Sequence, residues 1–286
     1  MPSLIDIRRR IRTVRNTQQI TKAMKMVSAA KLRRAQDRVI AARPYAKMFG
    51  KVLANVAAAA AGDEALASHP LLAARPEKRI QLILLTADRG LAGAFNSNLI
   101  KAANQFLSEH GDAVVELELI GRKGRDFFRK RQVPVTGECI GIYQKARYAD
   151  AAAIGSKVTD RFRAGEIDAV YLVYNGFKSV MTQQLTATRI LPVSLPEQTA
   201  AVEYIYEQPP LQLLEQLLPR YVEMAVFQAV LESAAAEFAA RMTAMDAATS
   251  NAADVIERLT LYMNRVRQAS ITREIIEVVS GAAALE

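Results

Sequence analysis

The C-terminal third of the chain places apolar residues at alternating steps of three and four, starting at Leu214. Fourteen of the seventeen positions on this register are apolar, although hydrophobic residues make up only 51% of the chain. An unbroken three-four spacing is typical of the seam of a coiled coil. The positions are Leu214, Leu217, Tyr221, Met224, Gln228, Leu231, Ala235, Phe238, Met242, Met245, Thr249, Ala252, Ile256, Leu259, Met263, Val266 and Ser270.

No glycine or proline interrupts the 61 residues from Arg220 to Ser280. As one helix they would extend about 90 Å, because each residue adds about 1.5 Å. That length exceeds the diameter of a domain of this size, so much of the helix is expected to project. Ten of the 21 residues from Ala234 to Asp254 are alanine, which keeps the helix slim. The alternative is two or three ordinary helices, although residues that favour turns are missing.

The first sixty residues predict a second long helix, which is expected to pair antiparallel with the first. Ser3 followed by Asp6 is typical of a helix N-cap. The apolar spacing then skips across 16–19 and resumes on shifted stripes, and Pro44 could kink the helix. Met24 and Met26 cannot both face the seam, so one is expected to be open to a partner. The expected stripes are Leu4, Ile7, Ile11 and Val14; Ile20, Met24 and Val27; and Leu32, Ala35 and Val39.

The middle of the chain changes to short apolar runs that alternate with helical stretches, which favours a parallel sheet. The expected strands are 79–86, 114–121 and 169–175, and 181–193 is expected to add an edge strand. The expected helices are 98–110, 123–131 and 150–164.

The predicted fold is therefore an α/β domain inserted between long N- and C-terminal helices that form an antiparallel coiled coil. Its expected parts are an N-terminal helix at 1–61, an α/β domain at 76–200 and a C-terminal helix at 208–286. The apolar end of the chain, with Ile271 and Val278, suggests that other subunits enclose it.

Charge is distributed unevenly, at +12 for residues 1–60 and −5 for residues 207–286. The basic stretches 8–15 and 31–34 could bind nucleic acid, form a solvated face or meet an acidic protein partner. No aromatic residue lies in the first 44 positions, which removes base stacking. Neither a secretory leader nor a mitochondrial transit peptide is expected, because the basic pattern continues for some fifty residues.

Residue types that carry chemistry are scarce. The only cysteine is Cys139 and the only histidines are His69 and His110, so neither a metal site nor a catalytic residue is expected. The stretch 86–98, TADRGLAGAFNSN, lies between a strand and a helix, where phosphate can bind. It matches neither common phosphate-loop pattern, so we predict a structural turn, with Asp88 as a cap or local ion-pair partner.

Three stretches resemble the gamma subunit of F-type ATP synthases. They are NTQQITKAMKMVSAAKLRRAQ (16–36), DRGLAGAFN (88–96) and ITREIIEVVSGAA (271–283), and the resemblance covers essentially the whole chain. Ala92 departs from the cysteine that many members carry, and no cysteine-bearing insertion is present. These features favour a bacterial type without thiol regulation.

The resemblance implies a central rotor shaft that is not itself catalytic and needs no cofactor. It would turn inside a hexamer of alpha and beta subunits, with the epsilon and delta subunits in the same complex. Its α/β domain would stand on the c ring, at the cytoplasmic face of the bacterial inner membrane, and it would bind no nucleic acid. Membrane association would come through the complex only. Proton-driven rotation of the ring would then cycle the beta subunits through their conformations.

The resemblance also implies contact residues. Those for alpha and beta would be Met24, Arg241, Arg267, Gln268, Thr272 and Glu274, and those for the c ring would be Tyr204 and Tyr206. Two other functions stay open on the residues alone. One is a Rossmann-like enzyme, which nucleotide binding by the lone chain would support. The other is a nucleic-acid-binding coiled coil, which salt-sensitive DNA binding would support.

Overall fold

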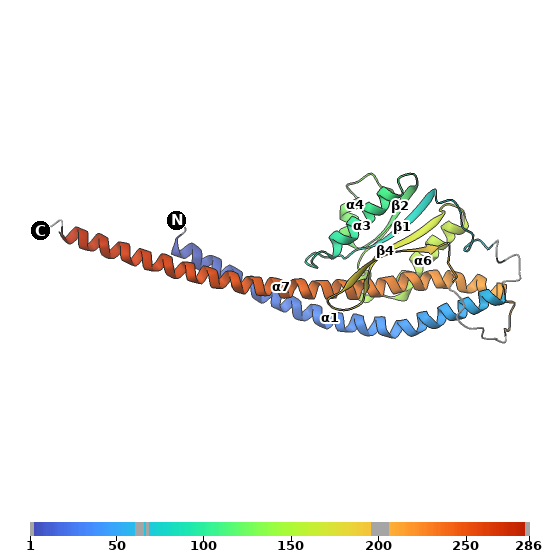
Figure 1. Ribbon diagram of the computed structural model, residues 1–286, viewed down its shortest axis with the longest axis horizontal. Coiled ribbons are helices and arrows are strands. Elements are labelled where there is room, and N and C mark those ends of the chain that lie inside the picture. The colour runs from blue at the N-terminus through green and yellow to red at the C-terminus, as the bar shows by residue number, and fades with distance from the viewer. Residues whose placement is uncertain (1–2, 61–65, 67–68, 196–205, 284–286) are drawn as a thin grey trace. The chain divides into compact units, whose positions relative to one another are not determined.

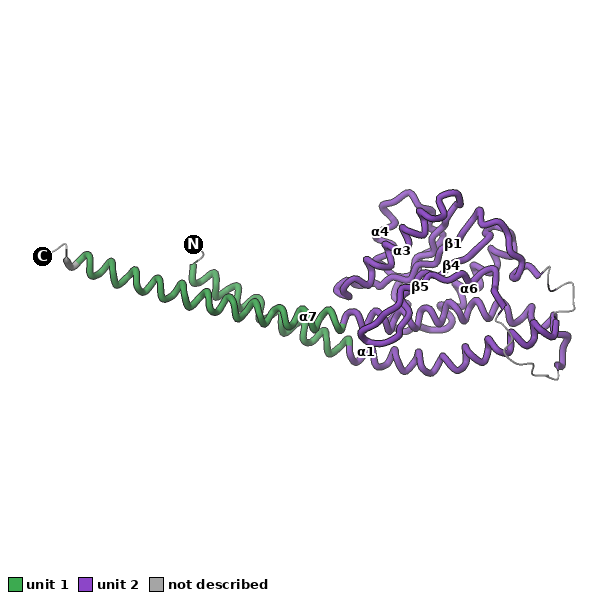
Figure 2. Tube along the Cα trace, viewed as in Figure 1, with its two compact units in different colours: residues 1–28, 242–286 green, residues 29–241 purple. Residues whose placement is uncertain are grey.

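The computed structural model describes residues 3–60, 66, 69–195 and 206–283 (Figure 1). It divides into two compact units, which are described separately below. Unit 1 pairs residues 1–28 with 242–286, and unit 2 is the continuous stretch 29–241 (Figure 2).

Both long helices form without interruption. Helix α1 spans Leu4–Ala59 and helix α7 spans Pro210–Ala283, which confirms the single C-terminal helix and excludes hidden turns. Helix α1 continues through Pro44. At its start the Ser3 hydroxyl accepts the Asp6 N–H at 3.2 Å, and the Asp6 carboxylate accepts the Ser3 N–H at 3.3 Å. This reciprocal cap satisfies two N–H groups that a helix end leaves unpaired.

In unit 1 the two helices pair antiparallel along the predicted α7 seam, because Gln18 bonds to Thr249 while Lys25 bonds to Asp246. Every seam position of α7 from Met245 to Ser270 is buried or half-buried. The seam prediction for α7 is therefore confirmed in this unit.

The predicted skip in the α1 stripe is wrong. Ile20 and Val27 are 60% and 56% exposed, and the buried face instead continues through Thr21 and Ser28. The three-four register runs unbroken from Leu4 to Val39, with polar residues at its centre. Polar groups are tolerated there because they are bonded, as by the Thr21 and Thr249 hydroxyls, which lie 2.8 Å apart.

Unit 2 contains a five-stranded sheet in the order β3-β2-β1-β4-β5. The first four strands are parallel and β5 pairs antiparallel with β4, as the predicted added edge strand. Strand β3 was not predicted, because its sequence VTGEC is short and lacks an apolar run. The strands are β1 Arg79–Leu85, β2 Val114–Ile120, β3 Val135–Cys139, β4 Ala169–Phe177 and β5 Gln183–Leu191.

Helices cover both faces of this sheet. The chain crosses from β1 to β3 in one direction and returns to β4, so right-handed crossovers place α3 and α4 on one face and α6 on the other. Figure 1 shows α6 on the side of the sheet that faces α7. The helices are α3 Phe95–Glu109, α4 Arg122–Phe128, α5 Ile142–Lys145 and α6 Tyr148–Arg163.

Within unit 2, helix α7 is buried on two sides. The seam side meets α1, where Lys31 lies over the Phe238 ring and Phe49 stacks on Tyr221. A second stripe meets the α/β domain, where the Ser233 and Tyr143 hydroxyls lie 2.7 Å apart. A helix that packs on two sides needs small side chains to let its neighbours approach, which accounts for the buried alanines of α7 between Ala229 and Ala239. The second stripe is Leu218, Val222, Val226, Ala229, Ser233 and Ala236.

Candidate functional site

The loop that follows β1 is held by bonds within the chain. The two Asp88 carboxylate oxygens accept the N–H groups of Arg122, at 3.1 Å, and Gly141, at 3.0 Å. Arg122 begins α4 and Gly141 precedes α5, so Asp88 caps the starts of two helices. The expected capping role is therefore confirmed, and this carboxylate is engaged in holding the fold.

The tip of this loop has an unusual backbone. Leu91 has a φ of 63° and is 65% exposed, and Gly93 has a φ of 55°. A bulky residue in the left-handed region is uncommon and signals a position that its surroundings impose. Arg241 of α7 supplies part of that constraint by donating to the carbonyl oxygens of Arg89, at 3.4 Å, and Gly90, at 3.2 Å.

Arg241 also forms an ion pair with Glu237, one turn earlier on α7. Only 12% of the Arg241 side chain and 5% of the Glu237 side chain are exposed. Burial raises the pKa of the Glu237 carboxyl, and Arg241 opposes that shift. Arg241 therefore joins α7 to the loop after β1, and its predicted contact with alpha or beta stays a prediction.

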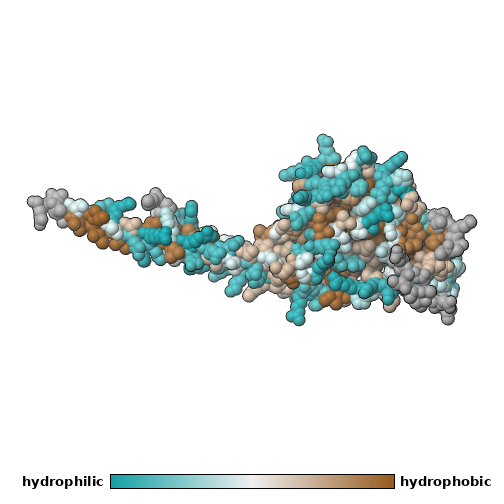
Figure 3. All heavy atoms as spheres, in the orientation of Figure 1, coloured by the Kyte–Doolittle hydropathy of each residue, from teal (hydrophilic) through white to brown (hydrophobic). Residues whose placement is uncertain are grey.

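The other residues expected to meet alpha and beta lie on unit 1. Met24 is half-buried on α1, whereas Arg267, Gln268, Thr272 and Glu274 are exposed on α7. Two of them form hydrogen bonds within α7: the Thr272 hydroxyl donates to the Gln268 carbonyl at 2.9 Å, and the Glu274 carboxylate accepts the Ser270 hydroxyl at 3.3 Å. Exposed apolar neighbours surround them (Figure 3): Ile271, Ile275, Ile276, Val278 and Val279.

Of the two tyrosines expected to contact the c ring, only Tyr206 lies within the described residues. Tyr204 lies outside the described residues. Tyr206 is half-buried, and its hydroxyl donates to the Asn55 carbonyl at 3.4 Å, so it contacts the end of α1. Contact of either residue with a c subunit stays a prediction.

Sequence reasoning predicted only part of an exposed apolar surface on α1 in unit 1. Ile20, Met26 and Val27 lie on the sides of α1 that face away from α7, and each is more than half exposed. The apolar character of Ile20 and Val27 had suggested seam positions. Met26, by contrast, agrees with the expectation that one of Met24 and Met26 is open. The signal that could have revealed them is the unbroken register Val14, Gln18, Thr21, which places Ile20 off the seam.

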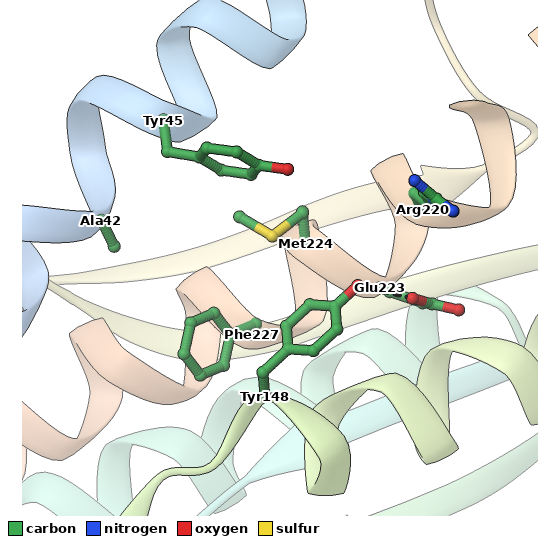
Figure 4. Close-up of a pocket in the computed structure, with 7 residues that line it drawn as sticks. All are labelled: Ala42, Tyr45, Tyr148, Arg220, Glu223, Met224 and Phe227. Atoms are coloured by element: carbon green, nitrogen blue, oxygen red, sulfur yellow. Dashed lines mark hydrogen bonds between the residues drawn. The ribbon is translucent and has the colours of Figure 1, made fainter. Parts of the chain in front are cut away.

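Unit 2 contains an open groove of about 600 Å³ between α1, α6 and α7. Figure 4 shows Tyr45 of α1, Tyr148 of α6, and Met224 and Phe227 of α7 converging on it. The Tyr148 hydroxyl donates to Glu223 at 2.6 Å, and its ring meets Phe227 edge to face. The lining residues are Ala42, Tyr45, Tyr148, Arg220, Glu223, Met224 and Phe227.

Two further findings concern the described part of the chain alone. No group of three or more His, Cys, Asp or Glu residues there could hold a metal ion. No helix in those ranges is both long and apolar enough to cross a membrane.

Comparisons with known proteins identify the family. The ATP synthase family model matches residues 3–285. The chain is 68% identical to the ATP synthase gamma chain of Solibacter usitatus, with both proteins covered completely. It is 51% identical to that of Pelotomaculum thermopropionicum, again over both full lengths. The chain therefore belongs to the ATP synthase gamma chain family.

Solved structures agree with this fold. The Tetrahymena thermophila mitochondrial ATP synthase central stalk and c ring contains a chain that is 26% identical, with a TM-score of 0.62. That match covers 80% of this chain and 99% of the other. A chain of the Euglena gracilis mitochondrial ATP synthase has a TM-score of 0.69, covers 99% and 94%, and at 19% identity shows the fold alone.

Proposed function

We propose that this chain is the central rotor shaft of a bacterial F-type ATP synthase. It couples proton-driven rotation of a c ring to the conformational cycle of catalytic beta subunits. The observation that carries this proposal is the 68% identity over the full length of an ATP synthase gamma chain. The chain itself performs no nucleotide chemistry, since Asp88, its best carboxylate candidate, caps two helices.

The proposed partners follow from the complexes that contain its structural relatives, which comprise a central stalk, F1 and a c ring. Alpha and beta subunits form a hexamer around the long helices, with epsilon and delta in the same complex. The chain acts at the cytoplasmic face of the inner membrane and reaches the membrane only through the complex. Its functional parts are the three segments 1–61, 76–200 and 208–286.

The proposed contacts require surfaces that the fold leaves open. Gln268, Thr272 and Glu274 are exposed, and so are the apolar side chains of Ile271 and Ile275 beside them. Rotation can change the conformations of beta only if the shaft contacts them differently at each angle. An asymmetric set of polar and apolar groups supplies such differences. Met24, Arg241 and Arg267 complete the proposed contacts with alpha and beta, and Tyr204 and Tyr206 those with the c ring.

The exposed apolar surface of α1 gives a sharp test. Changing Ile20 and Val27 together to serine should leave the melting temperature of the isolated chain nearly unchanged, because both side chains are more than half exposed. The same double variant should reduce recovery of the chain with tagged alpha and beta subunits, measured by mass spectrometry of the purified complex.

Met181→Ser is the matched control, because Met181 is an exposed apolar residue in the turn before β5. It should be recovered with alpha and beta at the level of the unchanged chain. Full recovery of the Ile20 and Val27 variant would contradict an enclosing hexamer at this surface. Failure of the unchanged chain to co-purify with alpha and beta would overturn the proposed function.

A further inference from the structure

Helix α6 is bonded on opposite sides to two different parts of unit 2. Towards the sheet, Lys157 meets Glu118 at 2.7 Å and donates to the Thr136 carbonyl at 2.9 Å. One turn later, Arg161 donates to Gln81 at 2.8 Å and pairs with Glu116 at 2.7 Å. The bonded groups lie on β1, β2 and β3, so α6 is held across three neighbouring strands.

This polar layer is enclosed on its sheet side, although 38% of the Lys157 side chain is exposed. Gln81 is fully buried and Glu118 is only 4% exposed. At Gly137, on β3, an added Cβ would lie 2.2 Å from the Glu118 carboxylate and 2.5 Å from the Lys157 ammonium group. Charge-assisted bonds in such surroundings are stronger than exposed ones and resist displacement. The sheet and α6 are therefore expected to move together.

Towards α7, the bonds of α6 converge on Glu223. The Tyr148 hydroxyl donates to one carboxylate oxygen at 2.6 Å, and the Ser156 hydroxyl donates to the other at 3.0 Å. Figure 4 shows the end of the Tyr148 side chain beside Glu223. Gly155 lies between these donors, and a Cβ there would stand 2.8 Å from the Glu223 Cα. The two helix backbones thus lie close together where the carboxylate is bound.

The Tyr148 hydroxyl is committed to this contact. Burial and the bond to Glu223 raise the pKa of Tyr148 to about 12, so it stays a donor at any physiological pH. The Tyr148 ring also packs edge to face on Phe227, one turn further along α7, with ring centroids 5.6 Å apart. The contact therefore combines two hydrogen bonds, an aromatic pair and a glycine that allows close approach.

From this geometry we propose that Glu223 is a positioning residue, which fixes α7 to α6 so that the α/β domain and α7 turn together under load. The inference rests on the proposed function. A rotor that receives force on its α/β domain must pass it to α7, and α6 is bonded directly to both the sheet and α7. A bond with both carboxylate oxygens engaged resists sliding and twisting better than apolar packing, which is non-directional.

The test uses the assembled enzyme in inverted membrane vesicles. Two rates are measured for each variant and normalised to the amount of complex: ATP hydrolysis with the proton gradient dissipated, and ATP synthesis driven by the gradient. Glu223→Ala should leave unloaded hydrolysis nearly unchanged and lower loaded synthesis about threefold or more, as expected when two bonds to a charged group are lost. Glu223→Gln, which keeps an acceptor oxygen, should recover most of the synthesis rate.

Two further variants separate positioning from folding. Gly155→Val should reproduce the loss under load by forcing α6 and α7 apart without removing the carboxylate. Glu215→Ala, which removes an exposed carboxylate about two turns earlier on α7, should match the unchanged enzyme in both rates. The melting temperatures of the Glu223→Gln and Glu215→Ala variants should stay close to that of the unchanged chain.

Several outcomes would overturn the inference. One is an unchanged ratio of synthesis to hydrolysis in Glu223→Ala. Another is an equal fall in both rates, which indicates a merely structural role. Neither outcome would contradict the proposed function. That function would be contradicted if vesicles prepared without this chain still coupled ATP hydrolysis to proton transport.

Discussion

At the scale of single residues, Glu237 and Arg241 form a buried ion pair whose two members are expected to contribute unequally to folding stability. Burial raises the pKa of Glu237, so this site tolerates a neutral group. Arg241 in turn bonds to two carbonyls of the loop after β1. Replacing Arg241 by a neutral residue leaves the buried Glu237 carboxylate without its ion-pair partner and removes two hydrogen bonds to the loop. Replacing Glu237 by glutamine keeps an acceptor oxygen for Arg241.

Arg241→Gln should therefore lower the free energy of unfolding by about 3 kcal/mol, a typical value for breaking a buried pair. Glu237→Gln should cost clearly less. Urea denaturation of the isolated chain measures both, with Arg258→Gln on an exposed part of α7 as the control. A larger loss in Glu237→Gln than in Arg241→Gln would refute this assignment of roles.

His69 gives unit 2 a dependence on pH. The ring is buried, and its Nδ1 accepts the Leu71 N–H at 3.2 Å. Burial, and then the charge of Arg163, lower the pKa of His69 below its ordinary value of 6.5. The unfolded chain thus binds a proton more readily than the folded one, so stability is retained above about pH 6.5 and falls as the pH drops through the lowered folded pKa.

His69→Asn keeps an acceptor for the Leu71 N–H but cannot be protonated. The melting temperature of the unchanged chain should fall more steeply than that of His69→Asn between about pH 7.5 and 5.5, as followed by circular dichroism. The difference isolates His69 from the carboxylates, which titrate in both chains. Parallel curves for the two chains would show that His69 does not contribute.

At the scale of elements, the pairing of α1 with α7 in unit 1 depends on polar groups within an apolar stripe. The Thr21 and Thr249 hydroxyls lie 2.8 Å apart, and each also lies within bonding distance of a carbonyl of its own helix. Because a hydroxyl has one hydrogen, one threonine donates to the other, which donates to its own carbonyl. Leaving one such hydroxyl without its partner costs more than replacing both by methyl groups of similar shape.

Each single change, Thr21→Val or Thr249→Val, should lower stability by about 1 kcal/mol, and the double variant should be at least as stable as either. A double-mutant cycle from thermal unfolding gives the coupling. Thr13→Val on the exposed side of α1 serves as a comparison, because the Thr13 hydroxyl donates to the Arg9 carbonyl of its own helix. Additive losses in the double variant would show that the two hydroxyls do not interact.

At the scale of the whole molecule, the proposed function depends on groups that the folded chain leaves exposed near the end of α7. Gln268 can form directed hydrogen bonds to an enclosing subunit, whereas the residues beyond Gly281 carry no charge until Glu286. Gln268→Leu should therefore slow turnover of the assembled enzyme, while deletion of Ala282–Glu286 should leave assembly and ATP synthesis largely intact.

Turnover per complex, measured on purified enzyme, decides this ranking. One lost hydrogen bond corresponds to roughly 0.5–1.5 kcal/mol, which is up to about tenfold in rate. Neither change should alter the melting temperature of the isolated chain, because Gln268 is exposed. An unaffected Gln268→Leu enzyme combined with an inactive deletion would reverse this account.

The amino-acid sequence alone determined the long helices, the parallel strands with an antiparallel edge, and the family. Periodicity reports these directly, because a helical face repeats every three to four residues and a buried strand is a short apolar run. The three stretches that carry the family resemblance are also local. Strand β3 escaped prediction because an edge strand needs no continuous apolar run.

Only the tertiary structure decided which residues face which neighbour. Ile20 and Val27 are apolar yet exposed, whereas Thr21 is polar yet buried against Thr249. Sequence alone could not predict this burial, because Thr249 lies 228 residues away along the chain. In the same way, Glu223 became a candidate once α6 lay against α7 and brought Tyr148 to its carboxylate. Side-chain periodicity records burial, but the pairing of polar groups depends on contacts between distant segments, which no local pattern contains.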